Sequence, residues 1–288
     1  DGILSEEIWS NLAPATNFSL MWPETRHGNK IPLKYETTAY LGYGQDAIYV
    51  GAILKHPNPN QMPKEFSQRD EIWNVDAETF FVTFNTYNDD LNFFGFQITS
   101  AGTLGDLYSS GSIDSDDFLY DTVFSAKSHI GSDFWSVEML IPYSALRFSE
   151  KEVQLWGLNF GRKIQSLDET YVWSPVNVNE FEYHESNGIL TGIENVSPPV
   201  RLFFYPYLQS SINLQKGVKS GSSYSAGMDI KYGLSSSFTL DASLIPDFGQ
   251  VAFDNIELNM GPYEQQFSEN RAFFTEGATL FEIADGDM

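Results

Sequence analysis

The chain has 288 residues, of which 39 are Asp or Glu and 16 are Lys or Arg, and its net charge of −23 would repel a nucleic-acid backbone. It contains no cysteine, which excludes disulfides, thiolate zinc sites and cysteine nucleophiles. No stretch of about 18 consecutive apolar residues occurs, which excludes a transmembrane helix. We therefore expect no nucleic-acid partner, and any bound metal would need oxygen or imidazole ligands.

From residue 1 to about Ser197, short apolar and aromatic segments alternate with Gly, Asn, Asp and Pro clusters. This spacing is typical of an antiparallel sandwich and predicts an all-β fold class. Helical signals are limited to short turns at 4–12 and 143–148. The clearest predicted strands are 47–54, 79–84, 91–99, 134–141 and 154–160.

A domain boundary is predicted where Asn195 and Ser197 are followed by Pro198 and Pro199. Asn and Ser favour turns, and proline cannot donate the hydrogen bonds of a β-ladder. The sequence pattern also changes after this point. We therefore predict two domains, 1–197 and 198–288.

The second domain has strands with two distinct faces. In the segment 224–232, apolar and polar residues alternate, and the apolar face begins with Tyr224 and ends with Tyr232. After a tight turn at 233–236, the same alternation repeats at 238–244. A weaker copy occurs at 208–214. Strands of a membrane β-barrel have this length and alternation, with aromatic residues at both ends. A soluble hairpin that packs one face on a core explains the pattern equally well. Because an open sheet edge cannot face lipid, the barrel interpretation requires a chain that continues past Met288.

The first domain has segments that resemble a known family. They are Asp1-Gly2-Ile3-Leu4 with Trp9, 38–43 with 47–50, 73–84, 132–148 and 156–162. With these segments, most of residues 1–197 resembles the family 9 carbohydrate-binding modules. The resemblance implies a jelly-roll-like β-sandwich that binds sugar, often with structural calcium and with tryptophans that clasp a saccharide ring.

The second domain carries a further motif in the segments 245–251 and 267–277. It resembles a family of outer-membrane proteins of unassigned function, in which a module of this kind precedes a C-terminal β-barrel. The resemblance implies that 198–288 is the N-terminal part of a truncated outer-membrane β-barrel with membrane lipid as a partner. The expected location is the outer membrane, with the first domain in the periplasm or, as the alternative, at the cell surface.

Sugar binding needs a flat aromatic surface and planar polar groups. Trp22, Trp73 and Trp173 have polar neighbours, and Asn177 follows the last of them. Arg162, at the end of the matched segment 156–162, is the fifth candidate ligand-binding residue. The remaining tryptophans lie among periodic apolar residues and are expected in the core. The alternative is that all six tryptophans simply pack in the interior.

The acidic residues Asp89, Asp90, Asp114 and Asp116 form two clusters. Closely spaced carboxylates supply the oxygen ligands that calcium prefers, so calcium is a candidate cofactor and no other cofactor is expected. Solvated turns are the alternative, because no twelve-residue calcium loop is present. The four histidines lack the spacing of a zinc helix, and each is expected at the surface or in a loop.

No serine-elbow, phosphate-binding or dinucleotide-binding motif occurs, so the chain is not expected to be an enzyme. The first hypothesis is a non-catalytic glycan-binding domain of an outer-membrane protein. The second is a structural, assembly or gating domain for export or uptake that binds envelope proteins and no sugar. The third is a glycan-acting hydrolase, which would need two carboxyl groups brought together by folding.

Overall fold

The computed structural model describes residues 1–72, 75–89, 91–110, 116–117, 120–174, 188–213, 221–235 and 238–245. The chain divides into two compact units, Asp1–Pro199 and Val200–Met288. The all-β prediction is confirmed, since α1 (Glu7–Ser10) is the only α-helix in these ranges. Within the same ranges, no helix is long and apolar enough to cross a membrane.

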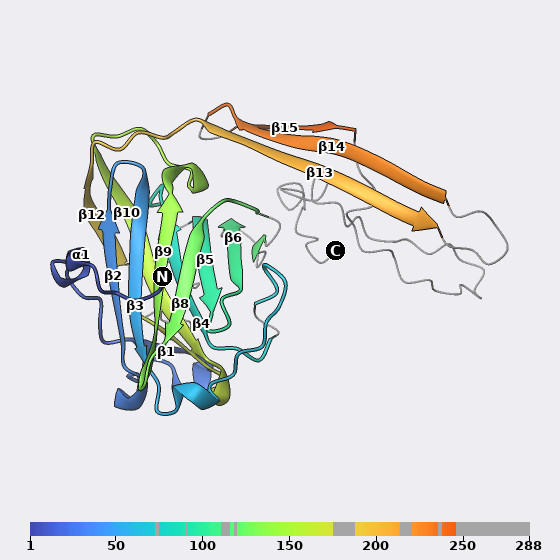
Figure 1. Cartoon of the computed structure of the whole chain (residues 1–288). Helices are drawn as coiled ribbons and strands as arrows, with labels where there is room; N and C mark the ends of the chain where they lie inside the picture. Colours follow the sequence, from blue (N-terminus) through green and yellow to red (C-terminus); the bar gives the residue numbers. More distant parts are fainter. Residues whose placement is uncertain are drawn as a thin grey trace, which may run out of the picture. The chain divides into compact units, whose positions relative to one another are not determined.

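The first unit is a sandwich of two antiparallel sheets, and Figure 1 shows the smaller sheet as its nearer layer. The smaller sheet has the strand order β2-β3-β9-β8 and the larger one the order β1-β11-β10-β4-β5-β6-β7, with β12 also paired to β10. The strands of the smaller sheet are β2 (Thr37–Tyr43), β3 (Ala47–Lys55), β8 (Ser125–Ile130) and β9 (Phe134–Pro142). Those of the larger sheet are β1 (Ser19–Trp22), β4 (Thr79–Asn85), β5 (Asn92–Thr99), β6 (Leu104–Ser110), β7 (Asp116–Asp117), β10 (Val153–Ile164), β11 (Glu169–Val172) and β12 (Gly188–Glu194).

Short 3-10 turns join several of these strands. They are η1 (Glu24–Arg26), η2 (Leu33–Tyr35), η3 (Pro59–Gln61), η4 (Tyr143–Ala145) and η5 (Gln165–Leu167). The predicted helical segment 4–12 contains only α1, and the predicted turn 143–148 contains η4. The five predicted strands are all present, although β10 continues to Ile164 where the prediction ended at 160.

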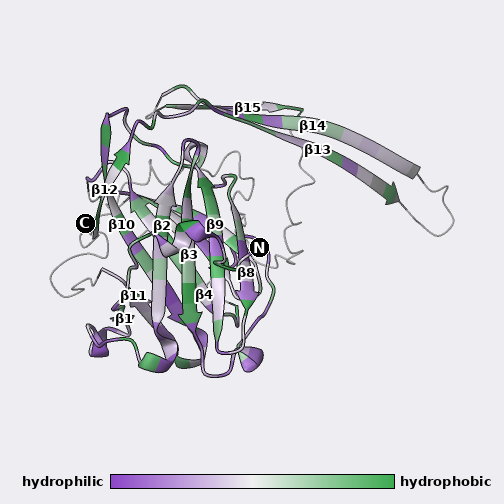
Figure 2. Ribbon diagram, turned by 60° about the vertical axis from the view of Figure 1, so that its left-hand side comes forward, coloured by the Kyte–Doolittle hydropathy of each residue, from purple (hydrophilic) through white to green (hydrophobic). Residues whose placement is uncertain are grey.

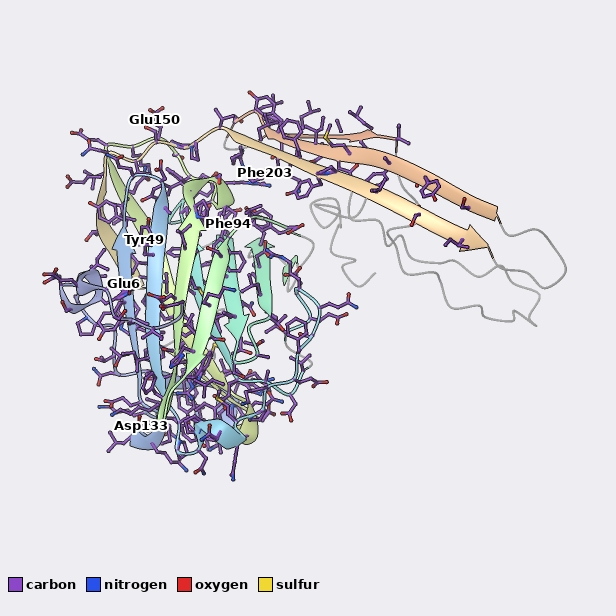
Figure 3. The ribbon with its side chains drawn as sticks, viewed as in Figure 1. Glu6, Tyr49, Phe94, Asp133, Glu150 and Phe203 are labelled. Carbon is purple, nitrogen blue, oxygen red and sulfur yellow. The ribbon has the colours of Figure 1, made fainter. Side chains whose placement is uncertain are left out.

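The core lies between the two sheets because every second side chain of a strand points to the same face. The core contains Ile48, Val50 and Leu54 of β3 and Trp135 of β9. Phe94 of β5 is also in this interior (Figure 3). Figure 2 shows hydrophobic and hydrophilic residues interleaved along the strands of the smaller sheet, as expected for a sheet with one buried face.

The central strands of the larger sheet depart from this alternation. Every residue of β4 is buried, and in β5 all residues after Asn92 are buried. Strands covered on both faces show this continuous burial. The face turned away from the core is therefore also screened from water, although it carries many polar side chains.

The second unit is a three-stranded antiparallel sheet in the part of the chain that is described. Its strands are β13 (Arg201–Asn213), β14 (Gly221–Gly233) and β15 (Thr239–Leu244). The register places Leu202 beside Tyr232 and Tyr232 beside Leu240, so the predicted alternation is confirmed. One face, here called the apolar face, carries Leu202, Phe204, Pro206 and Leu208, then Tyr224, Ala226, Met228, Ile230 and Tyr232, then Leu240, Ala242 and Leu244.

Candidate functional site

The strongest candidate for a binding site is the outer face of the larger sheet. The register aligns Asn159, Thr83, Gly95 and Leu107 in one row across β10, β4, β5 and β6. The next row consists of Gly161, Phe81, Gln97 and Gly105. We call this surface the polar face and define it as Thr79, Phe81, Thr83, Asn85, Phe93, Gly95, Gln97, Gly105, Leu107, Ser109, Gly157, Asn159 and Gly161.

Four polar side chains of the polar face are buried and have an atom without a hydrogen-bond partner. These atoms are Thr79 Oγ1, Asn85 Nδ2, Gln97 Oε1 and Ser109 Oγ, and none of the four residues is more than 3% exposed. A buried polar atom left unpaired costs roughly 1–3 kcal/mol, which is why such atoms are few in folded proteins. Several of them on one sheet face give this face unused hydrogen-bonding capacity, which a ligand could reach only if the groups that now screen the face from water moved aside.

Glycines let large side chains lie flat on the polar face. A Cβ atom added to Gly161 would come within 1.9 Å of the Phe81 ring. A Cβ atom on Gly95 would contact the Leu107 side chain. A Cβ atom on Gly105 would contact the side chain of Ile72, which lies in the loop before β4. The absence of a Cβ atom therefore lets the Phe81 ring lie over Gly161 of β10, on the side of β4 away from Gln97.

Asn159 fixes the chain where it leaves β11. Its Nδ2 donates to the Ser174 carbonyl at 3.0 Å, and its Oδ1 accepts from the Ser174 N–H at 2.9 Å. With these two hydrogen bonds the Asn159 side chain pairs with the Ser174 backbone as a neighbouring strand would, at the edge of the polar face. The segment that follows contains the predicted ligand-binding residue Asn177, which lies outside the described residues.

The predicted tryptophans have different surroundings. Trp22 is 51% exposed on β1, where it pairs with Thr170 of β11. Trp173 follows β11, is half-buried and packs against the core ring Phe160 with 5.9 Å between centroids. Three residues of strand separate these positions, about 10 Å, so the two rings do not face each other. Trp73 lies outside the described residues.

Arg162, a predicted ligand-binding residue, has instead the surroundings of a structural residue. Its side chain is 0% exposed and points into the core. The guanidinium donates to Glu78 Oε2 at 3.1 Å and to the carbonyls of Tyr35 and Lys55 at 2.9 Å each. These bonds tie β10 to the smaller sheet, and no surface of Arg162 is open to a ligand.

His56 lies in the loop after β3, as expected, but it is buried beside the same ion pair. Its Nε2 lies 3.9 Å from Glu78 Oε1. Burial and the nearby charge of Arg162 lower the pKa of His56, so the imidazole stays neutral. Burial also raises the pKa of Glu78, and Arg162 opposes that effect.

The candidate calcium ligands are not brought together in the described residues. Asp89 Oδ1 accepts from the N–H groups of Leu91 and Asn92 at 3.0 Å, which closes a turn. Asp90 and Asp114 lie outside the described residues, as does the side chain of Asp116, whose backbone belongs to β7. Over the described part of the chain, no group of three His, Asp or Glu side chains could hold a metal ion.

A buried acidic group next to the polar face was not anticipated from sequence. Asp106 faces the core side of β6, where it forms an ion pair with Arg69 and accepts from the Thr122 N–H at 2.7 Å. Burial raises the pKa of Asp106 to about 7. Asp70 Oδ1 accepts from the Asp106 N–H at 2.9 Å, so this cluster fastens the loop before β4 to β6.

Comparison with known proteins gives matches in both units. Residues 198–285 match the model of a family described as a domain of unknown function, DUF5916. Comparison with the curated proteins finds no match. Among solved structures, a candidate carbohydrate-binding protein from Bacteroides uniformis is 16% identical with a TM-score of 0.49, over 63% of this chain and 87% of that one.

Two further solved structures are of a family 9 carbohydrate-binding module from Caldicellulosiruptor kristjanssonii. The complex with cellotriose is 15% identical with a TM-score of 0.44, over 66% of this chain and 87% of that one. The complex with glucose is 16% identical with a TM-score of 0.46, over 69% of this chain and 94% of that one. Because these identities are below 25% and these TM-scores are below 0.5, the assignment of a β-sandwich rests on the strand pairing described above.

Proposed function

We propose that the first unit binds a carbohydrate through the polar face and does not convert it chemically. The observation that carries this proposal is the set of unpaired buried atoms on Asn85, Gln97, Ser109 and Thr79, on the sheet face that also carries the aromatic rings of Phe81 and Phe93. Sugar hydroxyls both donate and accept hydrogen bonds, and the C–H face of a sugar ring packs on aromatic carbons. A sugar therefore matches both properties of this face.

The binding energy follows from the burial of these groups. The amide of Gln97 and the hydroxyl of Ser109 are already out of water, so a ligand that pairs with them pays little further desolvation. A hydrogen bond to such a group contributes about 0.5–1.5 kcal/mol. The sequence resemblance of residues 1–197 to carbohydrate-binding modules supports the same reading.

We further propose that the second unit attaches this module to the outer membrane as the first part of a β-barrel, with the module in the periplasm. The apolar face supports this proposal, because Leu208 is 81% exposed and Tyr224 is 77% exposed. An exposed apolar face of this kind marks a lipid or protein contact. A role for structural calcium also stays a proposal.

The proposed function is tested by applying the full chain to a glycan array in a detergent that contains no sugar. We expect saturable retention by a defined set of glycans, competition by the free sugar, and no new reducing ends after incubation. The array is run with and without added calcium. Failure of the folded chain to bind any glycan would refute sugar binding, and release of product would refute the non-catalytic assignment.

Gln97→Leu provides a matched test of the polar face, with Gln61→Leu at an exposed position of η3 as its control. Replacing an unpaired buried amide by an apolar group removes a desolvation cost, so Gln97→Leu should keep or raise the thermal stability of the first unit. Retention on the array should fall in Gln97→Leu and stay unchanged in Gln61→Leu. Equal retention of both variants would exclude Gln97 from the site.

A further inference from the structure

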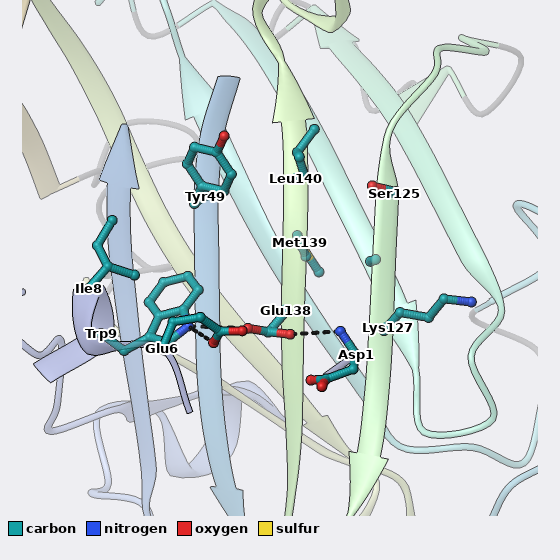
Figure 4. A pocket seen from close by; sticks show the side chains of 11 residues that line it. Asp1, Glu6, Ile8, Trp9, Tyr49, Ser125, Lys127, Glu138, Met139 and Leu140 are labelled. Carbon is teal, nitrogen blue, oxygen red and sulfur yellow. Dashed lines mark hydrogen bonds and ion pairs between the residues drawn. The ribbon is translucent and has the colours of Figure 1, made fainter. Parts of the chain in front are cut away.

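The outer face of the smaller sheet holds a separate groove of about 430 Å³ (Figure 4). Cross-strand pairs form its floor, with Tyr49 beside Leu140 and Leu140 beside Ser125. The N-terminal segment crosses the same face and closes one side of the groove with Trp9, which packs on Gly51. Figure 3 shows Tyr49 and Glu6 on this part of the unit. A groove of this volume fits a small ligand.

Two carboxylates at the side of the groove are held in place by Trp9. The indole Nε1 donates to Glu6 Oε2 at 3.1 Å and to Glu138 Oε1 at 3.2 Å. Glu138 Oε2 also accepts from the Asp1 nitrogen at 3.0 Å and from the Gly2 N–H at 2.8 Å. A carboxylate has about four acceptor positions, so these three bonds leave Glu138 about one position for a further donor. Lys127 pairs with Glu138 across the strands and supplies a donor on the other side.

These groups match an uncharged polyhydroxylated ring. The Tyr49 ring and the Leu140 side chain offer an apolar floor, while Glu138 and Lys127 offer an acceptor and a donor at its edge. The net charge of −23 and the two glutamates disfavour an anionic ligand.

Glu6 does not have the property of a glycosidase's general acid. Such an acid is a carboxyl group with a raised pKa. The pKa of Glu6 is instead lowered, chiefly by a backbone hydrogen bond and against a small effect of burial. Glu6 is therefore suited to accept a hydrogen bond from a sugar hydroxyl and not to donate a proton.

We infer that the groove is a second carbohydrate site, which binds one neutral sugar ring on Tyr49 with Glu138 and Lys127 contacting its hydroxyls. The inference rests on the proposed function, because it gives the same module two sites. The groove and the polar face are the outer faces of the two layers of one sandwich. One chain would thus contact two glycan ends or two neighbouring glycan chains, which raises avidity.

The test is equilibrium dialysis of the full chain with radiolabelled methyl β-glucoside, methyl β-galactoside and N-acetylglucosamine. We expect two bound sugars per chain for at least one of these probes. Tyr49→Ala should remove one site, and Tyr49→Phe should keep it because the ring remains. Tyr43→Ala is the matched control, since Tyr43 is exposed on the same sheet but does not line the groove. Thermal melts confirm that each variant is folded.

The outcomes separate this inference from the proposed function. A single site that Gln97→Leu weakens at least tenfold and Tyr49→Ala leaves unchanged would overturn the second site and keep the first. A single site lost only in Tyr49→Ala would support the groove and refute the polar face. Absence of binding by the wild-type chain would overturn both.

Discussion

Arg162→Met is expected to destabilise the first unit strongly, because the substitution leaves Glu78 as an unpaired charge in the core. Both side chains of this ion pair are 0% exposed. Removing one partner of a buried pair costs about 3–5 kcal/mol. The variant also leaves the carbonyls of Tyr35 and Lys55 without the donor that now links β10 to the smaller sheet.

The destabilisation caused by Arg162→Met should increase as the pH rises. Burial already raises the pKa of Glu78, and loss of the Arg162 charge raises it further. A carboxyl group with a raised folded-state pKa holds its proton in the native protein after the unfolded chain has released it. The contribution of Glu78 to the free energy of unfolding is therefore greatest at low pH and is lost as pH rises through the folded-state pKa. The difference between Arg162→Met and the wild type should be larger at pH 8 than at pH 5.

Urea unfolding followed by tryptophan fluorescence measures this effect in the first unit alone, because all six tryptophans lie between Trp9 and Trp173. The midpoint should fall by about 1 M or more at pH 8. Lys55→Met is the control, since Lys55 and Glu36 are 52% and 43% exposed in their ion pair. Exposed pairs contribute about 1 kcal/mol or less. Stability of Arg162→Met within about 1 kcal/mol of the wild type, together with lost sugar binding, would refute the structural role.

Three further predictions follow from the same structure. Trp156→Ala, in the centre of the core, should lower the free energy of unfolding by roughly 3–5 kcal/mol in the same urea assay. The free energy of unfolding of the wild type should fall as pH rises from about 4 to about 7, because folded Asp106 holds a proton that the unfolded chain has lost. The fall should be at most about 1.4 kcal/mol per pH unit. In Asp106→Asn this pH dependence should be weaker. Leu208→Asp should reduce incorporation of the chain into phospholipid vesicles, measured by flotation, because it places a charge on the apolar face.

Each of these predictions has an outcome that contradicts it. A Trp156→Ala protein as stable as the wild type would contradict the assigned core. An equal pH slope in wild type and Asp106→Asn would exclude Asp106 as the titrating group. For the vesicle experiment, Ser225→Asp on the opposite face of β14 is the control, and equal flotation of the two variants would contradict a lipid contact by the apolar face.

Much of the fold was predictable because it depends on local patterns. Alternation of apolar and polar residues located β14 and assigned Tyr224 and Tyr232 to one face. The burial of Trp9, Trp135 and Trp156 followed from their apolar neighbours. The ends of strands were less predictable, since β10 continues through Gly161 and Arg162, where it pairs with the distant strands β4 and β11.

The candidate site was less predictable because it is assembled by register between distant strands. Gln97 and Asn85 lie in strands rich in aromatic residues, and no local signal distinguishes them from the other polar residues of β4 and β5. Trp22 and Trp173 have polar sequence neighbours, but those neighbours do not determine which face of the sheet a ring joins. Arg162 was predicted to bind ligand from its place in the segment 156–162, whereas its partner Glu78 lies 84 residues away in sequence.

A crystal structure of the chain in complex with the sugar that binds best on the glycan array tests sugar binding at the polar face most directly. We expect a sugar ring on the polar face, with a hydroxyl within about 2.7–3.2 Å of Gln97 Oε1 or Asn85 Nδ2 and the ring against Phe81. A sugar bound only elsewhere on the molecule, with the polar face filled by protein or water, would contradict it.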